Sequence, residues 1–162
     1  MKRVLFVCTG NIFRSLTADY ALRRCLSEKP GILIGSAGTE DFPHVVRPEV
    51  RDYLLSKGLD VRRHARRTLT RAILGEADLV VSMSTDHRAF IEEQFGLRTP
   101  LFLEACGLEA AALPDIEDVV LDYRTNAAAV TAHVRWTIDR IVELSPRLAS
   151  RIDTLLKERQ QA

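Results

Sequence analysis

KRVLFVCTGNIFRS, residues 2–15, predicts a strand, a short loop and the start of a helix. It contains a continuous apolar run over Val4–Val7, which is typical of a strand buried on both faces of a parallel sheet. Ser15–Leu26 then carries apolar residues at roughly helical spacing, which predicts a helix. Cys8 ends the strand, and Arg14 follows six residues later, where the helix begins. This order places Cys8 and Arg14 at the two ends of a short loop.

The loop between Cys8 and Arg14 has the layout of an anion cradle. A loop that enters a helix N-terminus directs backbone N–H groups into one concavity, and the helix dipole adds positive potential there. This field stabilises a tetrahedral dianion and favours the thiolate of Cys8, which is the form that attacks phosphorus. Arg14 supplies a planar fork for two phosphate oxygens. Gly10 and Asn11 tolerate the positive φ of a tight loop, and Ser15 can cap the helix and reach the sulfur.

The alternative interpretation of these residues is structural. Cys8 would then be a buried residue at a strand end, Arg14 a surface charge and Ser15 an ordinary helix cap. The strand before the loop, the small and polar residues inside it and the helix after it favour the phosphate-binding interpretation.

At these residues the chain resembles the low-molecular-weight protein tyrosine phosphatase family, whose signature has the form V-C-x-G-N-x-C-R-S-P. Phe13 stands where many members carry a second cysteine, and Leu16 stands where proline usually opens the helix. Ser84 replaces an aspartate that joins a polar network behind the loop in the family. The resemblance reaches about residue 144, and it continues through Gly35–Gly38, Gly58–Arg66 with His64, and Glu76–Met83.

The resemblance implies the roles of the site residues. Cys8 is the expected nucleophile, Arg14 the phosphate-binding arginine, and Ser15 the group that donates to the sulfur and stabilises the leaving thiolate. The residues expected around the phosphate are Thr9, Gly10, Asn11, Ile12, Phe13 and Arg14.

A proton donor for the leaving oxygen is the remaining requirement of this chemistry. Leu113–Val120 is an acidic segment ahead of the last long helix, and it resembles the Asp-Pro acid loop of the family. The resemblance implies Asp118 as the general acid, with Val119 in place of the proline. Asp115 and Asp122 are competing candidates, and three solvated loop carboxylates are the alternative.

The rest of the chain alternates between strand and helix patterns. This βαβ rhythm, together with the resemblance, predicts an α/β three-layer sandwich in which helices flank a four-stranded parallel sheet, within one domain over residues 1–162. Ser145-Pro146 reads as the N-cap and first residue of a final helix. Arg62–Arg67 is the one strongly basic run; a solvated turn is favoured, and a rim that attracts anionic substrates is the alternative. The expected strands are Val4–Val7, Ile32–Ile34, Asp78–Met83 and Pro100–Leu103, and the expected helices are Ser15–Leu26, Pro48–Leu55, Asp86–Phe95 and Tyr123–Leu144.

Composition narrows the function classes. The 23 Lys and Arg residues balance 22 Asp and Glu residues, so the formal charge of +1 gives no argument for a nucleic-acid or membrane partner. Cys8, Cys25 and Cys106 form no C-x-x-C pair, and the four histidines lack metal-ligand spacing, so neither a disulfide framework nor a metal or other cofactor is expected. We expect a cytoplasmic protein; the sequence does not determine its oligomeric state.

The function predicted is that of a cysteine-dependent phosphomonoesterase acting on a phosphoprotein or a small aryl phosphate. Ile12 offers an apolar wall to an aromatic ring, whereas related arginine phosphatases have threonine there, so phosphotyrosine is favoured over phosphoarginine. A thiol-dependent arsenate reductase is one alternative, but it needs further cysteines, and only Cys106 follows the third strand. A non-catalytic phosphate-binding regulatory module is the other.

Overall fold

β1 (Lys2–Cys8) is the central strand of a parallel sheet with the order β2-β1-β3. In the computed structural model, which describes residues 1–161, β1 pairs along its whole length with β2 (Ile32–Gly38). On its other side it pairs with β3 (Leu79–Ser82), from Val4 opposite Leu79 to Val7 opposite Ser82. Because the strands are parallel, their carboxyl ends meet at one edge of the sheet, and Cys8 lies at that edge.

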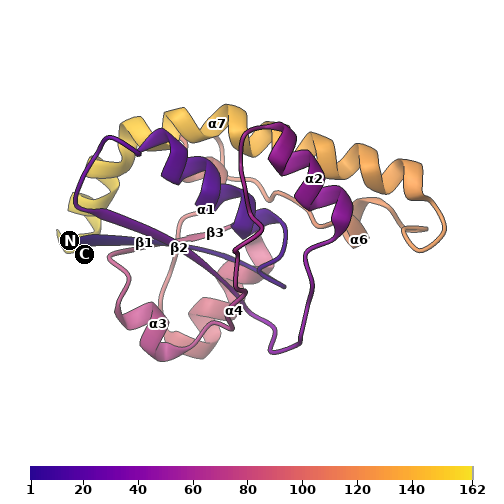
Figure 1. Cartoon of the computed structure of the whole chain (residues 1–162). Coiled ribbons are helices and arrows are strands. Elements are labelled where there is room, and N and C mark those ends of the chain that lie inside the picture. The colour runs from indigo at the N-terminus through magenta and orange to yellow at the C-terminus, as the bar shows by residue number, and fades with distance from the viewer. Residues whose placement is uncertain (162) are drawn as a thin grey trace.

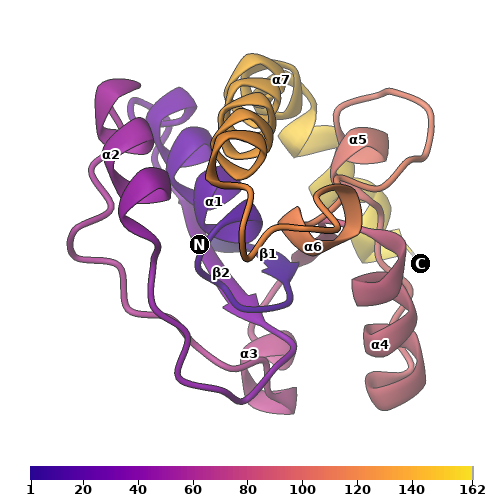
Figure 2. The same cartoon turned by 90° about the vertical axis from the view of Figure 1, so that its right-hand side faces the viewer.

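Helices cover both faces of the sheet, as Figures 1 and 2 show. The long helix α7, together with α1 and α2, lies on one side, and α3 and α4 lie on the other. The expected parallel α/β sandwich is thereby confirmed. The helices are α1 (Arg14–Cys25), α2 (Pro48–Ser56), α3 (Arg71–Gly75), α4 (Thr85–Phe95), α5 (Phe102–Ala105), α6 (Ile116–Val119) and α7 (Ala127–Gln161).

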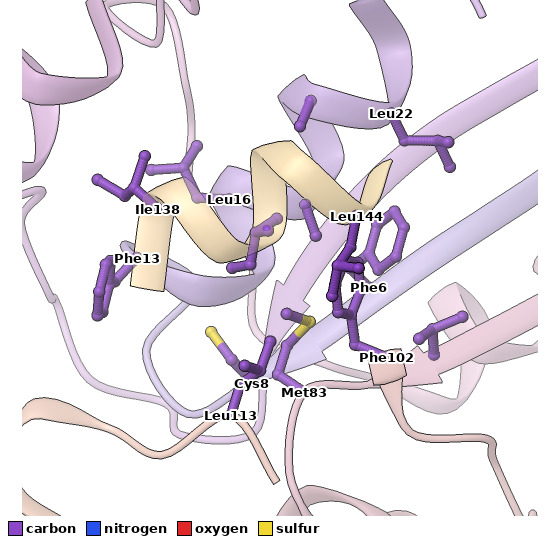
Figure 3. Packing of buried hydrophobic residues seen from close by; sticks show 14 of the residues in the cluster. Phe6, Cys8, Phe13, Leu16, Leu22, Met83, Phe102, Leu113, Ile138 and Leu144 are labelled. Atoms are coloured by element: carbon purple, nitrogen blue, oxygen red, sulfur yellow. The ribbon is translucent and has the colours of Figure 1, made fainter. Parts of the chain in front are cut away.

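The side-chain alternation of β1 divides the core into two clusters. Val4, Phe6 and Cys8 belong to the larger cluster, which β1 forms with α1 and α7 (Figure 3). Leu5 and Val7 point to the opposite face and join the smaller cluster against α3 and α4. Both faces of β1 are therefore buried, as the continuous apolar run predicts.

The expected fourth strand is absent from the sheet among residues 1–161. Within Pro100–Leu103, only Leu101 pairs with the sheet, through an isolated parallel bridge opposite Ser82, and the Ser82 N–H donates to the Pro100 carbonyl over 2.9 Å. The chain turns into α5 at Phe102, directly after this bridge. The apolar residues of Pro100–Leu103 are thus shared between one bridge and one helical turn, and the prediction of a strand there was wrong.

The expected break at Ser145-Pro146 is also absent. α7 runs without interruption from Ala127 to Gln161, with Pro146 inside it, and it begins after Tyr123 rather than at it. The Ser145 hydroxyl is buried and donates to the Ile141 carbonyl over 2.7 Å, which is a bond typical of a helix interior. Ser145 is therefore not a helix cap.

The other expected elements are confirmed with small changes in their ends. β2 extends four residues beyond the expected Ile34, to Gly38. α4 ends at Phe95, where Gly96 adopts the left-handed conformation with φ 70°. None of the helices in the described part of the chain is both long enough and apolar enough to span a lipid bilayer.

Candidate active site

Asn11 fixes the shape of the loop between β1 and α1. It is the one non-glycine residue with positive φ, at 55°, among residues 1–161, and its side chain is fully buried. The side-chain Nδ2 of Asn11 donates to the Ser15 hydroxyl over 3.0 Å, and its side-chain Oδ1 accepts from the backbone N–H of Arg67 over 3.0 Å. These bonds tie the middle of the loop both to α1 and to the segment that follows β2, so a left-handed residue is held in place.

Gly38 allows β2 to pass close beneath the same loop. A Cβ atom at this position would lie 2.6 Å from the Thr9 carbonyl oxygen. The Glu40 N–H donates to that carbonyl over 3.1 Å, so the loop is hydrogen-bonded to the segment that directly follows β2. Glycine is needed at residue 38 because no other side chain fits between the two backbones.

Cys8 and Ser15 form a pair inside this frame. The Cys8 Sγ atom lies 2.9 Å from the Ser15 Oγ atom, and both residues are buried. Because Ser15 Oγ already accepts a hydrogen bond from the amide of Asn11, its own proton is free to point at the sulfur. A hydroxyl that donates to sulfur stabilises a thiolate.

The backbone N–H groups of residues 10–13 face no acceptor of the chain. None of them donates to a backbone or side-chain acceptor within the part of the chain that the structure describes. Together with the N-terminus of the twelve-residue helix α1, these donors form a nest for an anion next to Cys8.

Arg14 is a buried charge that is held by four hydrogen bonds. Its side chain is 2% exposed and points across the loop rather than into solvent. One terminal nitrogen donates to the Leu113 carbonyl over 2.9 Å and to the Ser84 hydroxyl over 3.3 Å. The other donates to Asp115 Oδ2 over 2.7 Å and to Thr9 Oγ1 over 3.4 Å. Ser84 thus occupies the place behind Arg14 where the resemblance expects an aspartate.

Part of the basic run at residues 62–67 supports the loop. The His64 Nε2–H group donates to the Asn11 carbonyl over 2.8 Å, and Arg66 Nε donates to the Gly10 carbonyl over 3.1 Å. Burial lowers the pKa of His64, so the ring is neutral near pH 7. Arg62 and Arg63 form an exposed turn, as expected for part of this run. Sequence reasoning missed the supporting role because it depends on contacts across more than fifty residues of chain.

Cys8 opens into a cavity of about 180 Å³. Ile12 and Phe13 are among the apolar residues that line it. Residues of the segment after β2 and of the acidic segment complete its walls. The lining residues are Cys8, Thr9, Gly10, Ile12, Phe13, Arg14, Glu40, His44, Arg47, Val50, Asp115, Ile116 and Glu117.

Asp115, rather than the expected Asp118, lines this cavity. Its Oδ2 atom accepts the bond from Arg14, and its Oδ1 atom accepts from the Ile116 N–H over 2.8 Å at the start of α6. Asp118 turns back along α6, where its Oδ2 atom accepts from the Asp115 N–H over 2.9 Å. Of these two candidate acids, Asp115 therefore lines the cavity together with Cys8, and Asp118 bonds back to the backbone of the acidic segment.

The acidic segment is anchored at both sides. The Leu113 N–H donates to the Met83 carbonyl over 3.0 Å at the end of β3, and His133 of α7 lies with its Nε2 atom 3.1 Å from the Pro114 carbonyl. These contacts hold the acidic segment at the edge of the sheet where Arg14 bonds Leu113 and Asp115, which lie 99 and 101 positions further along the chain. Figure 2 shows α6 beside the end of β1.

A larger apolar groove of about 720 Å³ lies on the other side of α6, against α7. Val119 and Leu121 line it together with Trp136, and all three are exposed. Cys8 and Arg14 do not line this groove, so the smaller cavity is the candidate active site. The apolar residues after Asp118 consequently face the groove rather than the cavity.

His87 is the residue of the site that sequence reasoning missed. It is 1% exposed, its Nε2 atom lies 2.9 Å from Thr9 Oγ1, and the Ser84 N–H donates to its Nδ1 atom over 3.2 Å. Burial and the nearby Arg14 guanidinium lower the pKa of His87 to about 4. A signal was present, because a serine three residues before a polar side chain marks a helix start, but it does not reveal the contact with Thr9.

Residues 3–153 match the family model described as low molecular weight phosphotyrosine protein phosphatase. A protein-arginine-phosphatase of Bacillus subtilis (strain 168) is 34% identical over 96 residues, which cover 57% of this chain and 63% of that protein. The low molecular weight protein-tyrosine-phosphatase Etp of Escherichia coli (strain K12) is 34% identical over 87 residues, covering 53% of this chain and 57% of that protein. The chain thus spans about three fifths of these curated relatives.

The solved structures extend the likeness to nearly the whole fold. A YwlE mutant from Bacillus subtilis superposes with a TM-score of 0.79 at 23% sequence identity, covering 94% of this chain and 99% of that one. At this identity the likeness supports the arrangement of helices and strands alone.

Proposed function

The chain belongs to the low molecular weight phosphotyrosine protein phosphatase family, and we propose that it hydrolyses phosphomonoesters through a phosphocysteine intermediate. Cys8 is the nucleophile of the proposed reaction, Arg14 binds the phosphoryl oxygens, and Asp115 is the general acid and base. Ser15 stabilises the thiolate. The proposal moves the acid from Asp118 to Asp115.

The first step transfers the phosphoryl group to the protein. The substrate dianion enters the nest of backbone N–H groups and takes over the Arg14 nitrogen that otherwise bonds Asp115. Asp115 is then released towards the leaving group, to which it can give a proton. The Cys8 thiolate attacks phosphorus, the bond from phosphorus to the leaving oxygen breaks, and Asp115 gives its proton to that oxygen.

The second step returns the enzyme to its starting state. Asp115, now a carboxylate, takes a proton from water while the water oxygen attacks phosphorus. The sulfur–phosphorus bond breaks, inorganic phosphate is released, and the Ser15 hydroxyl stabilises the Cys8 thiolate that leaves. The transferring group is stabilised by Arg14 and the backbone donors, as electrostatic catalysis of phosphoryl transfer requires.

A single observation carries this proposal. Cys8, which is hydrogen-bonded to Ser15, lines the same small cavity as the ion pair of Arg14 and Asp115. A non-catalytic phosphate-binding module requires the arginine and the nest of backbone N–H groups. It does not require a buried cysteine with a hydroxyl donor, or a carboxylate in the same cavity. The arsenate reductase alternative needs a second reactive thiol. Cys106 is fully buried, and burial raises its pKa to about 12, so it is a poor relay.

Phosphotyrosine in a protein is the proposed substrate class. Ile12 and Phe13 line the cavity and offer an apolar surface to an aromatic ring. The relatives at 34% identity include both an arginine phosphatase and a tyrosine phosphatase, so the preference rests on the apolar side chain of Ile12.

Turnover of an aryl phosphate by wild type, Cys8→Ser and Arg14→Lys tests the proposed reaction. Cys8→Ser is expected to lose several orders of magnitude in kcat and still bind inorganic phosphate, since the backbone donors and Arg14 remain. Arg14→Lys is expected to be severely impaired because an ammonium group cannot reproduce the fork. Cys25→Ser serves as the matched control, because Cys25 lies at the last residue of α1 and should leave turnover intact. Normal turnover by Cys8→Ser would refute the proposal.

A further inference from the structure

The direction of each hydrogen bond around His87 can be deduced from the groups involved. The backbone N–H of Ser84 can only donate, so the Nδ1 atom of His87, 3.2 Å away, is its acceptor. The Ser84 hydroxyl lies 3.0 Å from the same Nδ1 atom and also contacts Asp86, so its proton, and not its lone pair, is directed at these two acceptors. A neutral imidazole that accepts at Nδ1 carries its proton at Nε2. The Nε2–H group therefore donates to Thr9 Oγ1, which lies 2.9 Å away.

The Thr9 hydroxyl consequently has a fixed orientation. Its oxygen accepts from His87 Nε2 and from an Arg14 nitrogen at 3.4 Å, which occupies both of its lone pairs. Its own proton finds no acceptor within residues 1–161, and Thr9 lines the same cavity as Cys8. We propose that this proton points at a phosphoryl oxygen, so that Thr9 is a side-chain donor to the substrate and His87 is the residue that positions it.

The surroundings of His87 keep its ring neutral. The ring is buried and faces the Arg14 guanidinium across the loop, with Asp86 on its own helix and Asp115 and Asp118 on the acidic segment. Burial and Arg14 outweigh the three carboxylates and lower the pKa of His87 to about 4. A protonated ring would direct an N–H at the backbone N–H of Ser84, so the neutral form is also the one that the helix start accommodates.

The proposed role of Thr9 adds a side-chain contact with the substrate to the proposed function, and it rests on that function. The backbone nest and Arg14 are common to any loop of this design, whereas a hydroxyl at residue 9 adds one more hydrogen bond to a charged acceptor. Loss of such a bond corresponds to a roughly 10- to 100-fold change in binding. The effect is expected on both phosphate affinity and kcat/KM, because the phosphoryl oxygens carry charge throughout the reaction.

The tautomer of His87 is tested first, on the unmodified protein. Two-dimensional ¹⁵N–¹H spectra of the imidazole at pH 7 are expected to show a protonated Nε2 and an unprotonated Nδ1. A ring protonated at Nδ1 would overturn the inference, because the Thr9 oxygen would then face an acceptor. This measurement needs no substitution, so it does not depend on how well a variant folds.

Phosphate binding tests the donor itself. In a Cys8→Ser background, the affinity for inorganic phosphate is measured by calorimetry with and without Thr9→Val, which keeps the shape of the side chain and removes the hydroxyl. The added substitution is expected to weaken binding about 10- to 100-fold, and Thr9→Ser is expected to recover most of the affinity. Equal affinity with threonine and valine would overturn the inference.

A double-mutant cycle separates positioning from general support of the fold. His87→Asn keeps an acceptor for the Ser84 N–H but is too short to reach Thr9, and it is expected to lower kcat/KM for an aryl phosphate about 3- to 10-fold. In a Thr9→Val background the same substitution is expected to have little further effect. An equal loss in both backgrounds would show that His87 does not act through Thr9. Wild-type turnover is the separate test of the proposed function, so the two failures are distinguishable.

Discussion

Asp115 and Asp118 lie three residues apart at the start of α6, yet their carboxylates make different contacts. Asp115 precedes the helix, where one oxygen caps α6 and the other reaches Arg14. Asp118 is the third residue of the helix, and its carboxylate returns to the Asp115 N–H. This reciprocal pair is a capping box, and it leaves only the first carboxylate free to face the cavity.

Leaving-group dependence distinguishes these two carboxylates. Asp115→Asn is expected to slow hydrolysis of phosphate esters with basic leaving groups far more than that of activated esters, because protonation matters least when the leaving oxygen is already stable. Asp118→Asn is the matched control and should show a nearly uniform, smaller loss. The measurement is the slope of log kcat against the leaving-group pKa for a series of aryl phosphates. A steep slope for Asp118→Asn alone would restore the original assignment.

Ile12 is expected to set the preference between two phosphorylated side chains. An apolar wall suits the ring of phosphotyrosine, whereas a threonine hydroxyl suits the polar guanidinium of phosphoarginine. Wild type should therefore favour phosphotyrosine by kcat/KM on matched peptides, and Ile12→Thr should shift the ratio towards phosphoarginine by about tenfold. Ile12→Val, which stays apolar, is the control. A wild-type preference for phosphoarginine would contradict the proposed substrate class while leaving the chemistry intact.

At the level of elements, sequence patterns predicted what local periodicity determines. β1 is a continuous apolar run, α1 has apolar residues at helical spacing, and α4 is followed by a glycine. The existence and approximate ends of these elements therefore follow from the sequence. α5, α6 and the single bridge at Leu101 do not follow from it. Each is only a few residues long, and in such short segments packing against α7 and β3 decides the conformation. The same reason explains why sequence patterns do not distinguish Asp115 from Asp118, since one helical turn determines which of the two lines the cavity with Cys8.

Pro146 shows how packing overrides a strong local signal. Proline inside a helix removes one backbone bond, here to the Val142 carbonyl, and it is usually found at the first turn. α7 nevertheless continues, because Ile141, Leu144, Leu148 and Ile152 are buried on either side of the proline in the larger core cluster. The residue itself is exposed, so the break in bonding faces solvent.

Replacing this proline should stabilise α7. Pro146→Ala restores the bond to the Val142 carbonyl, and we expect the free energy of unfolding to rise by about 1–2 kcal/mol after the greater flexibility of the unfolded chain is allowed for. Urea unfolding measures the change. Arg147→Ala, at the next exposed position of the helix, is the control and should stay within about 0.5 kcal/mol of wild type. A loss of stability in Pro146→Ala would mean that the helix requires a bend at this residue.

At the scale of the whole molecule, the site is assembled from segments far apart in the chain. The loop after β1 is supported by residues 64–67, backed by the start of α4 and covered by the segment before α6. Parallel strands bring these segments together because their carboxyl ends share one edge. The site therefore forms only in the folded protein. Because His87 is buried and neutral, we expect the free energy of unfolding to depend on pH.

Acid should destabilise the protein through His87. Its folded-state pKa of about 4 lies below the ordinary value of 6.5, so the unfolded chain binds more protons between these limits. The contribution of the neutral ring is fully present above pH 6.5, declines as the pH falls towards 4, and amounts to a loss of about 3 kcal/mol at most. Urea unfolding at pH 7 and pH 4.5 of wild type and His87→Gln measures it. Acid-labile pairs elsewhere, and His64 with its own lowered pKa, affect both proteins equally. Wild type should therefore lose more stability than the variant over this interval, and equal losses would show that His87 titrates normally in the folded protein.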